Sequence, residues 1–309
     1  MKRFGHSNEQ DDLSVSCENL NRLDGRQSVL FDSRKALIRE LAYSICRGGE
    51  ASADEIRNNY FSVFSSDDER GKYFSAISAV ERIELCLEIA SLIGKENPFY
   101  RSVFGPDEVC LPKAKEKISY VKNKFTDSAY LSFTKRLHSP RCSYSDSFET
   151  ICEDVFNGES EFCILPIETS TDGRLFSFYS LIDRYELKTS AICSVEHQGG
   201  TAFTRFALLK RSLSDRDVDN ITSESNAALE LKISLSSSDS PSMYNIFRAA
   251  DACGMPLLRT DSLSLPYGDS LISNYAVFGI DKTNLQGFLT YISLEFPQCY
   301  ASGLYPRES

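Results

Sequence analysis

The division between apolar and polar positions is sharpest in the middle of the chain. Five of the six residues in Phe162–Ile167 are apolar, and the polar run Glu-Thr-Ser-Thr-Asp-Gly follows them. This pattern predicts a short buried strand with hydroxyl and backbone N–H groups at its carboxyl end, where open α/β sheets usually hold ligands. A second apolar run, Thr201–Leu209, contains one charged residue, Arg205. A guanidinium in a core strand needs a carboxylate partner such as Glu168, or a water-lined cleft.

The N-terminal third of the chain has a different pattern. Residues 1–28 are polar without periodicity, which predicts a disordered tail. Apolar residues then recur at helical spacing, as in Leu37, Leu41 and Ile45, and Gly48-Gly49 closes that segment. We therefore expect residues 29–112 to form an all-helical region of several short helices.

Strands and helices alternate over residues 113–212, which predicts a single α/β lobe of order βαβαβ. Ser147 is the expected N-cap of its second helix, and Gly158 the expected end before the Phe162 strand. The strand Thr189–Val195 is separated from the Thr201 strand by only five residues, Glu196–Gly200. Its Gly-Gly pair predicts a β-hairpin.

The C-terminal part predicts a second type of fold. Residues 213–228 are polar and low in aromatics, which is typical of a linker. Residues 229–309 follow the ferredoxin-like order βαββαβ. The expected strands are Leu229–Leu235, Leu257–Leu265, Asn274–Ile280 and Cys299–Leu304, and the expected helices are Ser242–Cys253 and Asn284–Glu295.

Composition narrows the class of protein. With 41% hydrophobic and 25% charged residues the chain is typical of globular proteins, and a formal net charge of -10 argues against nucleic-acid binding. The apolar runs are too short to cross a membrane, and the N-terminus does not resemble a signal peptide. The ten cysteines are scattered without a C-x-x-C pair, so we expect buried free thiols, as at Cys86, Cys163 and Cys193, and a cytoplasmic location. No metal-ligand spacing or nucleotide-cofactor motif is present.

Several motifs resemble the prephenate dehydratase family. Leu165–Ser170 is similar to its V-P-I-E-N-S segment and Thr204-Arg205-Phe206 to its T-R-F signature. Upstream, the opening strand, loop and helix at Lys117–Ala129 and the helix at Ser147–Gly158 follow the order and spacing of that family. The resemblance implies one lobe of the periplasmic-binding-protein-like dehydratase fold. It also implies an ACT regulatory domain at 229–309, since Gly303–Arg307 is similar to the G-x-Y-P-R ending of such domains.

The resemblance also implies the site residues. In this family Thr204 would assist the leaving hydroxide and Arg205 would hold a carboxylate, so the implied catalytic set is Thr204, Arg205 and Phe206. Hydrogen bonds to substrate would come from the turn Glu168, Thr169, Ser170 and Thr171. An amino-acid regulator would lie against loops that contain Asp239, Pro241, Ser242, Asp261 and Ser262.

The chain departs from the family in ways that bear on activity. Thr169 stands where the family has Asn, and the family's second lobe is replaced by the predicted hairpin. The ligand loop has lost its glycine and carries Asp239, whose charge would repel a carboxylate. His197 at the hairpin tip is expected to be exposed rather than catalytic. The pattern of a chorismate mutase, which precedes the dehydratase in some relatives, is not visible in residues 29–112.

Three functions are consistent with these features. The first is a catalytically degenerate dehydratase-like protein of phenylalanine metabolism that acts as a regulatory, ligand-sensing or docking subunit. The second is a working prephenate or arogenate dehydratase, a carbon–oxygen lyase in which the helical region or a second subunit replaces the lost lobe. The third is a purely structural interaction protein. A small aromatic acid or amino acid, a second copy bound through the ACT-like domain, and a protein partner of the helical region are the expected partners.

Overall fold

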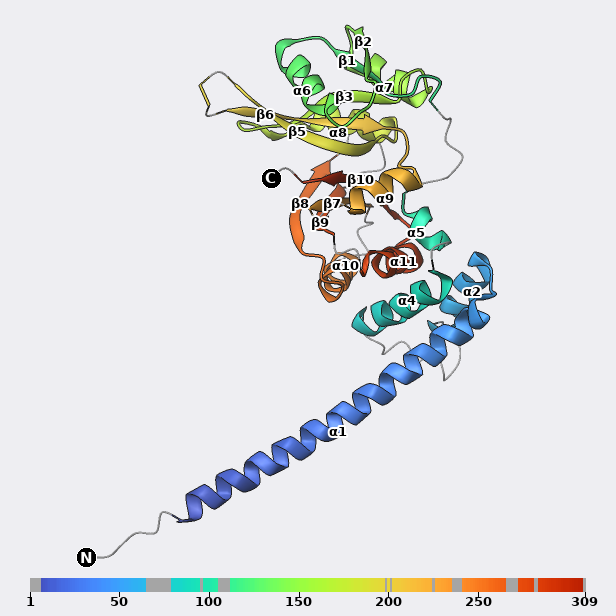
Figure 1. The fold of residues 1–309 in the computed structure, drawn as a ribbon, viewed down its shortest axis with the longest axis vertical. Helices are drawn as coiled ribbons and strands as arrows, with labels where there is room; N and C mark the ends of the chain where they lie inside the picture. The colour runs from blue at the N-terminus through green and yellow to red at the C-terminus, as the bar shows by residue number, and fades with distance from the viewer. Residues whose placement is uncertain are drawn as a thin grey trace, which may run out of the picture.

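The structure, a computed structural model, describes residues 7–64, 79–94, 97–104, 112–197, 199–200, 202–223, 226–234, 241–264, 272–280 and 283–307. These residues form a helical region, an α/β lobe and a domain of ferredoxin-like topology, and the lobe and this domain share one mixed sheet (Figure 1). Asp239 of the predicted ligand loop lies outside the described residues, as do Thr201, Leu235 and Leu265 at the bounds of predicted strands.

The helical region begins with one very long helix. α1 (Ser7–Ile45) is followed by the 3-10 turn η1 (Arg47–Gly49), α2 (Ala53–Phe64), α4 (Ala79–Ile93) and α5 (Pro98–Ser102). The N-terminal half of α1 projects away from the rest of the molecule (Figure 1). The predicted disordered tail is therefore wrong for residues 7–28. No Gly or Pro interrupts residues 7–24, and their Glu, Gln, Leu and Arg residues favour a helix even where no apolar stripe is present.

The lobe is a sheet covered on both faces. Its elements are β1 (Lys117–Val121), α6 (Lys124–Thr134), β2 (Arg141–Ser145), α7 (Phe148–Phe156), β3 (Phe162–Thr169), β4 (Gly173–Arg174), α8 (Phe176–Arg184), β5 (Lys188–Glu196) and β6 (Phe203–Lys210). β1 pairs in parallel with β2 and β3, and β3 pairs antiparallel with β6. α6 packs on the face that carries Ile164 and Phe206, whereas α7 and α8 pack on the face that carries Leu165 and Ala207.

Local signals in the lobe agree with the sequence. The Ser147 side chain accepts a hydrogen bond from the Glu149 N–H at 3.2 Å, which confirms the predicted N-cap of α7. Gly158 follows this helix with a φ of 74°, a conformation that favours glycine. β5 and β6 form the predicted hairpin, and both Gly199 and Gly200 have positive φ in its turn. Cys86, Cys163 and Cys193 are buried free thiols, as predicted.

The predicted linker contains a helix. α9 (Asp215–Ser223) begins after Ser214, whose N–H donates to the Asp217 carboxylate at 2.8 Å while its hydroxyl accepts from the Asp217 N–H at 3.3 Å. The linker prediction for 213–228 is therefore wrong over these residues. Val218 and Ile221 are three positions apart and both buried, which gives this polar segment the narrow apolar stripe that holds it on the core.

The C-terminal residues form the βαββαβ arrangement. Its elements are β7 (Ala227–Ser234), α10 (Pro241–Ala252), β8 (Leu257–Ser264), β9 (Ile272–Gly279), α11 (Leu285–Glu295) and β10 (Cys299–Pro306). The strand order β10-β7-β9-β8 is antiparallel throughout, and β10 also pairs in parallel with β5 of the lobe at Gly303 and Thr189. This single junction joins the two sheets edge to edge.

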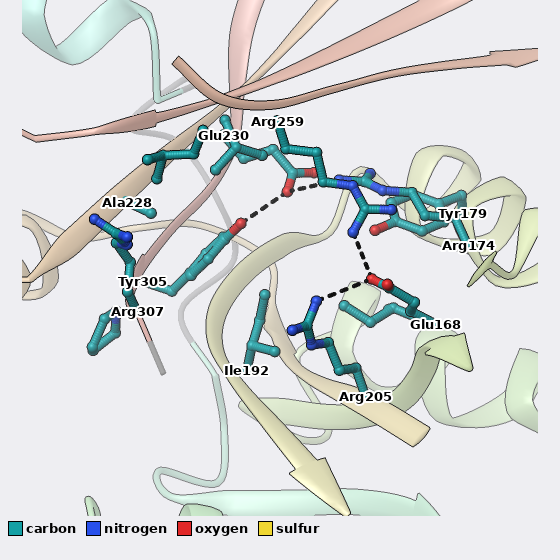
Figure 2. Close-up of a pocket in the computed structure, with 14 residues that line it drawn as sticks. Glu168, Arg174, Tyr179, Ile192, Arg205, Ala228, Glu230, Arg259, Tyr305 and Arg307 are labelled. Carbon is teal, nitrogen blue, oxygen red and sulfur yellow. Dashed lines mark hydrogen bonds and ion pairs between the residues drawn. The ribbon is translucent and has the colours of Figure 1, made fainter. Parts of the chain in front are cut away.

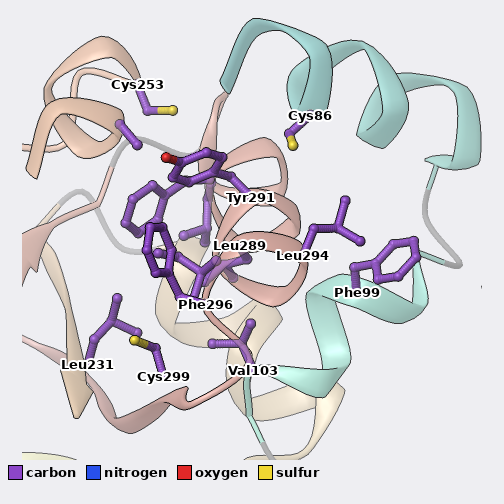
Figure 3. Close-up of a cluster of buried hydrophobic side chains, with 14 of the residues drawn as sticks. Cys86, Phe99, Val103, Leu231, Cys253, Leu289, Tyr291, Leu294, Phe296 and Cys299 are labelled. Carbon is purple, nitrogen blue, oxygen red and sulfur yellow. The ribbon is translucent and has the colours of Figure 1, made fainter. Parts of the chain in front are cut away.

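The described helices of the helical region pack on this C-terminal domain. α4 lies against α10 and α11, and α5 lies against α11 (Figure 3). Gly287 of α11 makes the closest approach, because a Cβ there would lie 2.1 Å from Cδ2 of Leu87 in α4. Arg82 of α4 forms an ion pair of 2.9 Å with Glu295, which also accepts a hydrogen bond from Tyr60 of α2. One continuous apolar core therefore connects the helical region to the βαββαβ domain.

Candidate functional site

The two motif segments lie side by side on adjacent strands. β3 and β6 are paired so that Glu168 lies opposite Arg205 and Thr169 lies opposite Thr204. Arg205 Nη1 contacts Glu168 Oε2 at 3.4 Å, so the carboxylate partner predicted for this guanidinium is confirmed. Glu168 is also the acceptor of a shorter bond, 2.7 Å, from Arg259 Nη1 of β8. One carboxylate therefore joins the lobe to the C-terminal domain.

Thr204 and Arg205 point to opposite faces of the sheet, as neighbouring residues of a strand do. Thr204 is buried, and its hydroxyl lies 2.9 Å from His197 Nε2 on the face covered by α6. The His197 ring in turn packs on Phe125 of α6, with ring centroids 4.5 Å apart. His197 is therefore partly buried and hydrogen-bonded, and the prediction of an exposed side chain is wrong. The hairpin that carries it folds back over the end of α6.

The turn after β3 uses its polar groups locally. The Thr169 hydroxyl donates to Asp172 Oδ2 at 2.9 Å and accepts from the Asp172 N–H at the same distance. Ser170 exchanges two hydrogen bonds with the backbone of Phe203, one through its N–H at 3.0 Å and one through its hydroxyl at 3.1 Å. The Thr171 hydroxyl donates to Asp172 Oδ2 at 3.0 Å. The hydroxyl groups of Thr169, Ser170 and Thr171 thus bind the turn and the neighbouring strand.

Arg205 belongs to an ionic cluster at the boundary between lobe and C-terminal domain (Figure 2). Arg174 of β4 lies 2.9 Å from the Asp261 carboxylate and 3.7 Å from Glu230, and Arg259 lies 2.7 Å from Asp261. The side chains of Arg174 and Glu230 are only 7% and 5% exposed, so this pair is shielded from solvent. Asp261 lies in β8 and its carboxylate is engaged in this cluster, and its role in binding a regulatory ligand stays a prediction.

The remaining predicted loop residues are divided between two elements. Ser262 lies in β8 beside Asp261 and donates to the Asn274 amide oxygen at 2.6 Å. Pro241 and Ser242 begin α10. Because Asp239 lies outside the described residues, the contribution of that loop to ligand binding stays a prediction.

Burial and charge act against each other in this cluster. Burial alone would lower the pKa of Arg174, but the negative charges of Glu230 and Asp261 outweigh it and raise that pKa above its ordinary value. Burial, followed by the Glu230 charge, raises the pKa of Tyr305, whose hydroxyl donates to Glu230 at 3.1 Å. Arg174 stays a cation and Tyr305 a neutral hydrogen-bond donor throughout the physiological pH range.

A cavity of about 270 Å³ opens on the Arg205 side of the sheet. It is lined by Ile167, Glu168, Arg174, Tyr179, Ile192, Arg205, Ala228, Glu230, Leu258, Arg259, Val277, Tyr305, Pro306 and Arg307. The helical region does not reach it, because α4 and α5 pack on α10 and α11. The hypothesis that the helical region replaces the lost lobe over this site is therefore wrong for the described helices.

Several residues of the cluster were not predicted from sequence. Arg174 follows the Asp172-Gly173 turn, where a charged residue is expected at the surface. Glu230 alternates with apolar residues in β7, and alternation ordinarily marks a solvent-facing side. Here that side faces the lobe, so only the relative position of the two domains reveals the cluster.

No group of three or more His, Cys, Asp or Glu side chains that could hold a metal occurs in the described part of the chain. Among the same residues, no helix combines the length and the apolar character that a membrane span requires.

Sequence comparisons return no relative, since no family model and no curated protein matches the chain. Comparison with solved structures gives a different result. The chain is similar to solved prephenate dehydratases. The enzyme from Streptococcus mutans shares 17% identity at a TM-score of 0.48, over 62% of this chain and 97% of its own. The enzyme from Arthrobacter aurescens, solved in complex with L-Phe, shares 13% at a TM-score of 0.44, over 62% and 90%. GqqA, described as a quorum quenching acylase, shares 16% at a TM-score of 0.46, over 63% and 97%.

Proposed function

We propose that this chain is a dehydratase-like protein of phenylalanine metabolism that lacks dehydratase activity and serves as a ligand-sensing or docking subunit. The observation that carries the proposal is the placement of the two motif residues. Thr204 faces α6, whereas Arg205 faces the cavity at the C-terminal domain. Decarboxylating dehydration requires a proton donor at the leaving hydroxide and a cation at a carboxylate of the same molecule. With Thr204 engaged by His197 on one face and Arg205 engaged by Glu168 on the other, the two groups do not converge on one small substrate.

The environment of each group supports this proposal. The Thr204 hydroxyl is engaged by His197 beneath the hairpin, and Arg205 is held by Glu168. A carboxylate ligand of Arg205 would have to compete with that existing ion pair. The turn hydroxyls at 169–171 are committed to the turn and to β6. Such a site lacks the preorganised, unoccupied donors through which enzymes stabilise developing charge.

The test is direct turnover. Purified full-length protein incubated with prephenate at neutral pH should form phenylpyruvate no faster than its Arg205→Ala and Thr204→Val variants. Arg248→Met is the matched control, because Arg248 is exposed on α10, remote from both motifs. A rate that depends on Arg205 or Thr204 but not on Arg248 would show that the protein is an enzyme. Repeating the assay across protein concentrations decides whether a second copy could supply the missing lobe.

The C-terminal domain is proposed to be ACT-like and to mediate assembly. Within the chain, α4 and α5 cover its helices, and β5 pairs with the edge strand β10. In the described sheet the other edge of this domain is β8, where Leu257 and Leu258 are 44% and 39% exposed. A homo-oligomer through this domain would therefore form at β8. We further propose that phenylalanine binds weakly, because Asp239 would repel its carboxylate, and that α1 docks a protein partner.

A further inference from the structure

The cavity between the lobe and the C-terminal domain has the charge of an anion site. Four of its lining residues are arginines, Arg174, Arg205, Arg259 and Arg307, and two are glutamates. Asp261 does not line the cavity, but it contacts two residues that do, Arg174 and Arg259. Even with Asp261 included, the guanidinium groups outnumber the carboxylates by one. The cavity can therefore receive one negative charge and become neutral.

Arg174 provides an independent observation. Its side chain is only 7% exposed, yet Nη1 makes no hydrogen bond in the described part of the chain. Nε approaches Asp261 Oδ2 at 2.9 Å but is not aligned for a hydrogen bond. A guanidinium has five N–H donors, and leaving one of them buried and unpaired destabilises the folded protein. An acceptor brought by a ligand would remove that destabilisation.

The rest of the lining is apolar. Ile192 of the lobe faces Ala228, Val277 and Tyr305 of the C-terminal domain, and these four side chains form one small cluster. Figure 2 shows Arg307 on one side of this cluster and Arg174, Arg205 and Arg259 on the other. The volume of about 270 Å³ lies just below the range of roughly 300–1,000 Å³ that is usual for small-molecule sites. The site therefore suits a compact molecule with one charged and one apolar end.

We propose that this cavity binds a compact organic carboxylate, a monoanion with an apolar body, clamped between the lobe and the C-terminal domain. The site shares Arg205 and Glu168 with the motif residues but is not the site that the motifs imply as a whole, since Thr204 faces away from it and the Asp239 loop contributes no described residue to it. It names a ligand class for the ligand-sensing role proposed above and rests on that role. Because strands of both domains line the cavity, occupancy strengthens the contact between them.

Calorimetric titration of the full-length protein with benzoate tests the proposal. Benzoate should bind with a stoichiometry of one, and benzamide, which has the same size without the charge, should bind at least tenfold more weakly. Arg307→Met should weaken benzoate binding about fivefold or more. Ala228→Leu, which adds volume at the apolar end, should abolish binding. Arg248→Met serves again as the control and should leave the affinity unchanged.

The outcomes separate this proposal from its alternatives. If benzoate fails to bind, or if it binds equally to wild type, Arg307→Met and Ala228→Leu, the site assignment is overturned. If inorganic phosphate binds more tightly than benzoate, the carboxylate class is wrong. Arg174→Met is avoided, since it would leave Glu230 and Asp261 buried without their partner. Turnover of prephenate would contradict the proposed non-catalytic function but not the cavity, whereas absent benzoate binding would contradict the cavity but not that function.

Discussion

At the scale of single residues, the junction of the two sheets changes the pKa of Lys188. It begins β5 beside β10, is 7% exposed, and its Nζ lies 4.4 Å from the centre of the Tyr300 ring. The pKa of Lys188 is lowered from 10.5 to about 8, mainly by burial and also by Lys232 and Arg211, while Glu186 and Asp183 oppose the change. The folded state therefore holds this proton less tightly than the unfolded chain does.

This difference predicts a pH dependence of stability. Between pH 8 and 10.5 the unfolded chain retains a proton on Lys188 that the folded protein has lost, so the free energy of unfolding rises with pH in that window. In Lys188→Met this contribution is absent. Relative to the variant, wild type should gain on the order of 2 kcal/mol between about pH 7 and 9.5. Urea unfolding at several pH values measures this difference, with exposed Lys135→Met as the control. Parallel pH curves for wild type and Lys188→Met would contradict it.

Residue-level prediction from sequence succeeded where both partners lie in the two motif segments, which form adjacent strands. Arg205 needs a carboxylate because it interrupts an apolar strand, and Glu168 is close to it in the neighbouring motif. Arg259 and Arg174 carry no such signal, since each lies in a segment with polar neighbours. Apart from Asp261, which lies two residues from Arg259, their partners come from strands about 60 to 90 residues away in the chain, for example Glu168 for Arg259. Such pairings depend on how the two sheets join, and the local pattern of apolar and polar residues does not show this.

At the scale of elements, alternation of apolar and polar positions predicted the strands and their order well. The hairpin and the βαββαβ sequence follow from turn residues and from apolar runs. Polar helices were missed. α1 lacks an apolar stripe over its first turns and α9 has only two buried apolar positions, Val218 and Ile221. Periodicity detects a helix through its buried face, so helices with little buried surface resemble tails and linkers.

The contact between α4 and α11 supplies a prediction at this scale. Gly287 lies inside α11, where alanine would ordinarily stabilise the helix by about 1 kcal/mol. Here the added Cβ would lie 2.1 Å from Leu87 Cδ2 and 2.8 Å from its Cγ. Gly287→Ala should therefore destabilise the protein by about 1–3 kcal/mol through overpacking.

A second substitution, Leu87→Ala, tests whether the contact with Leu87 causes this destabilisation. In a Leu87→Ala background the clash is removed, so Gly287→Ala should become neutral or stabilising. The double-mutant cycle, measured by urea unfolding, should give a coupling energy of about 2 kcal/mol or more. If the two substitutions were additive, the helices would not approach as closely as the structure shows.

At the scale of the whole molecule, the apolar cores do not follow the order of the segments along the chain. The helical region and the C-terminal domain share one core, in which buried residues such as Cys86 of α4 join buried residues of α11 such as Tyr291 and Leu294 (Figure 3). The lobe has two further cores, one on each face of its sheet, and the one beneath α7 and α8 also contains Leu263 and Tyr275 of the C-terminal domain. The helical region thus behaves as a cover for the helices of the C-terminal domain, although the lobe separates the two in sequence.

This organisation predicts the effect of truncation. Deleting residues 1–104 would remove α1, α2, α4 and α5 and expose the side of α11 that faces them, including Tyr291 and Leu294, both buried in the intact protein. An exposed patch of this kind drives association. The truncated chain should therefore form larger species than wild type in light scattering and unfold at a lower urea concentration. Deletion of residues 1–28 is the control, because the α1–α4 ion pairs begin at Arg34 in the described part of the chain. If the longer deletion changed neither the number of protomers per particle nor the urea concentration at the unfolding midpoint, the shared core would contribute nothing to stability.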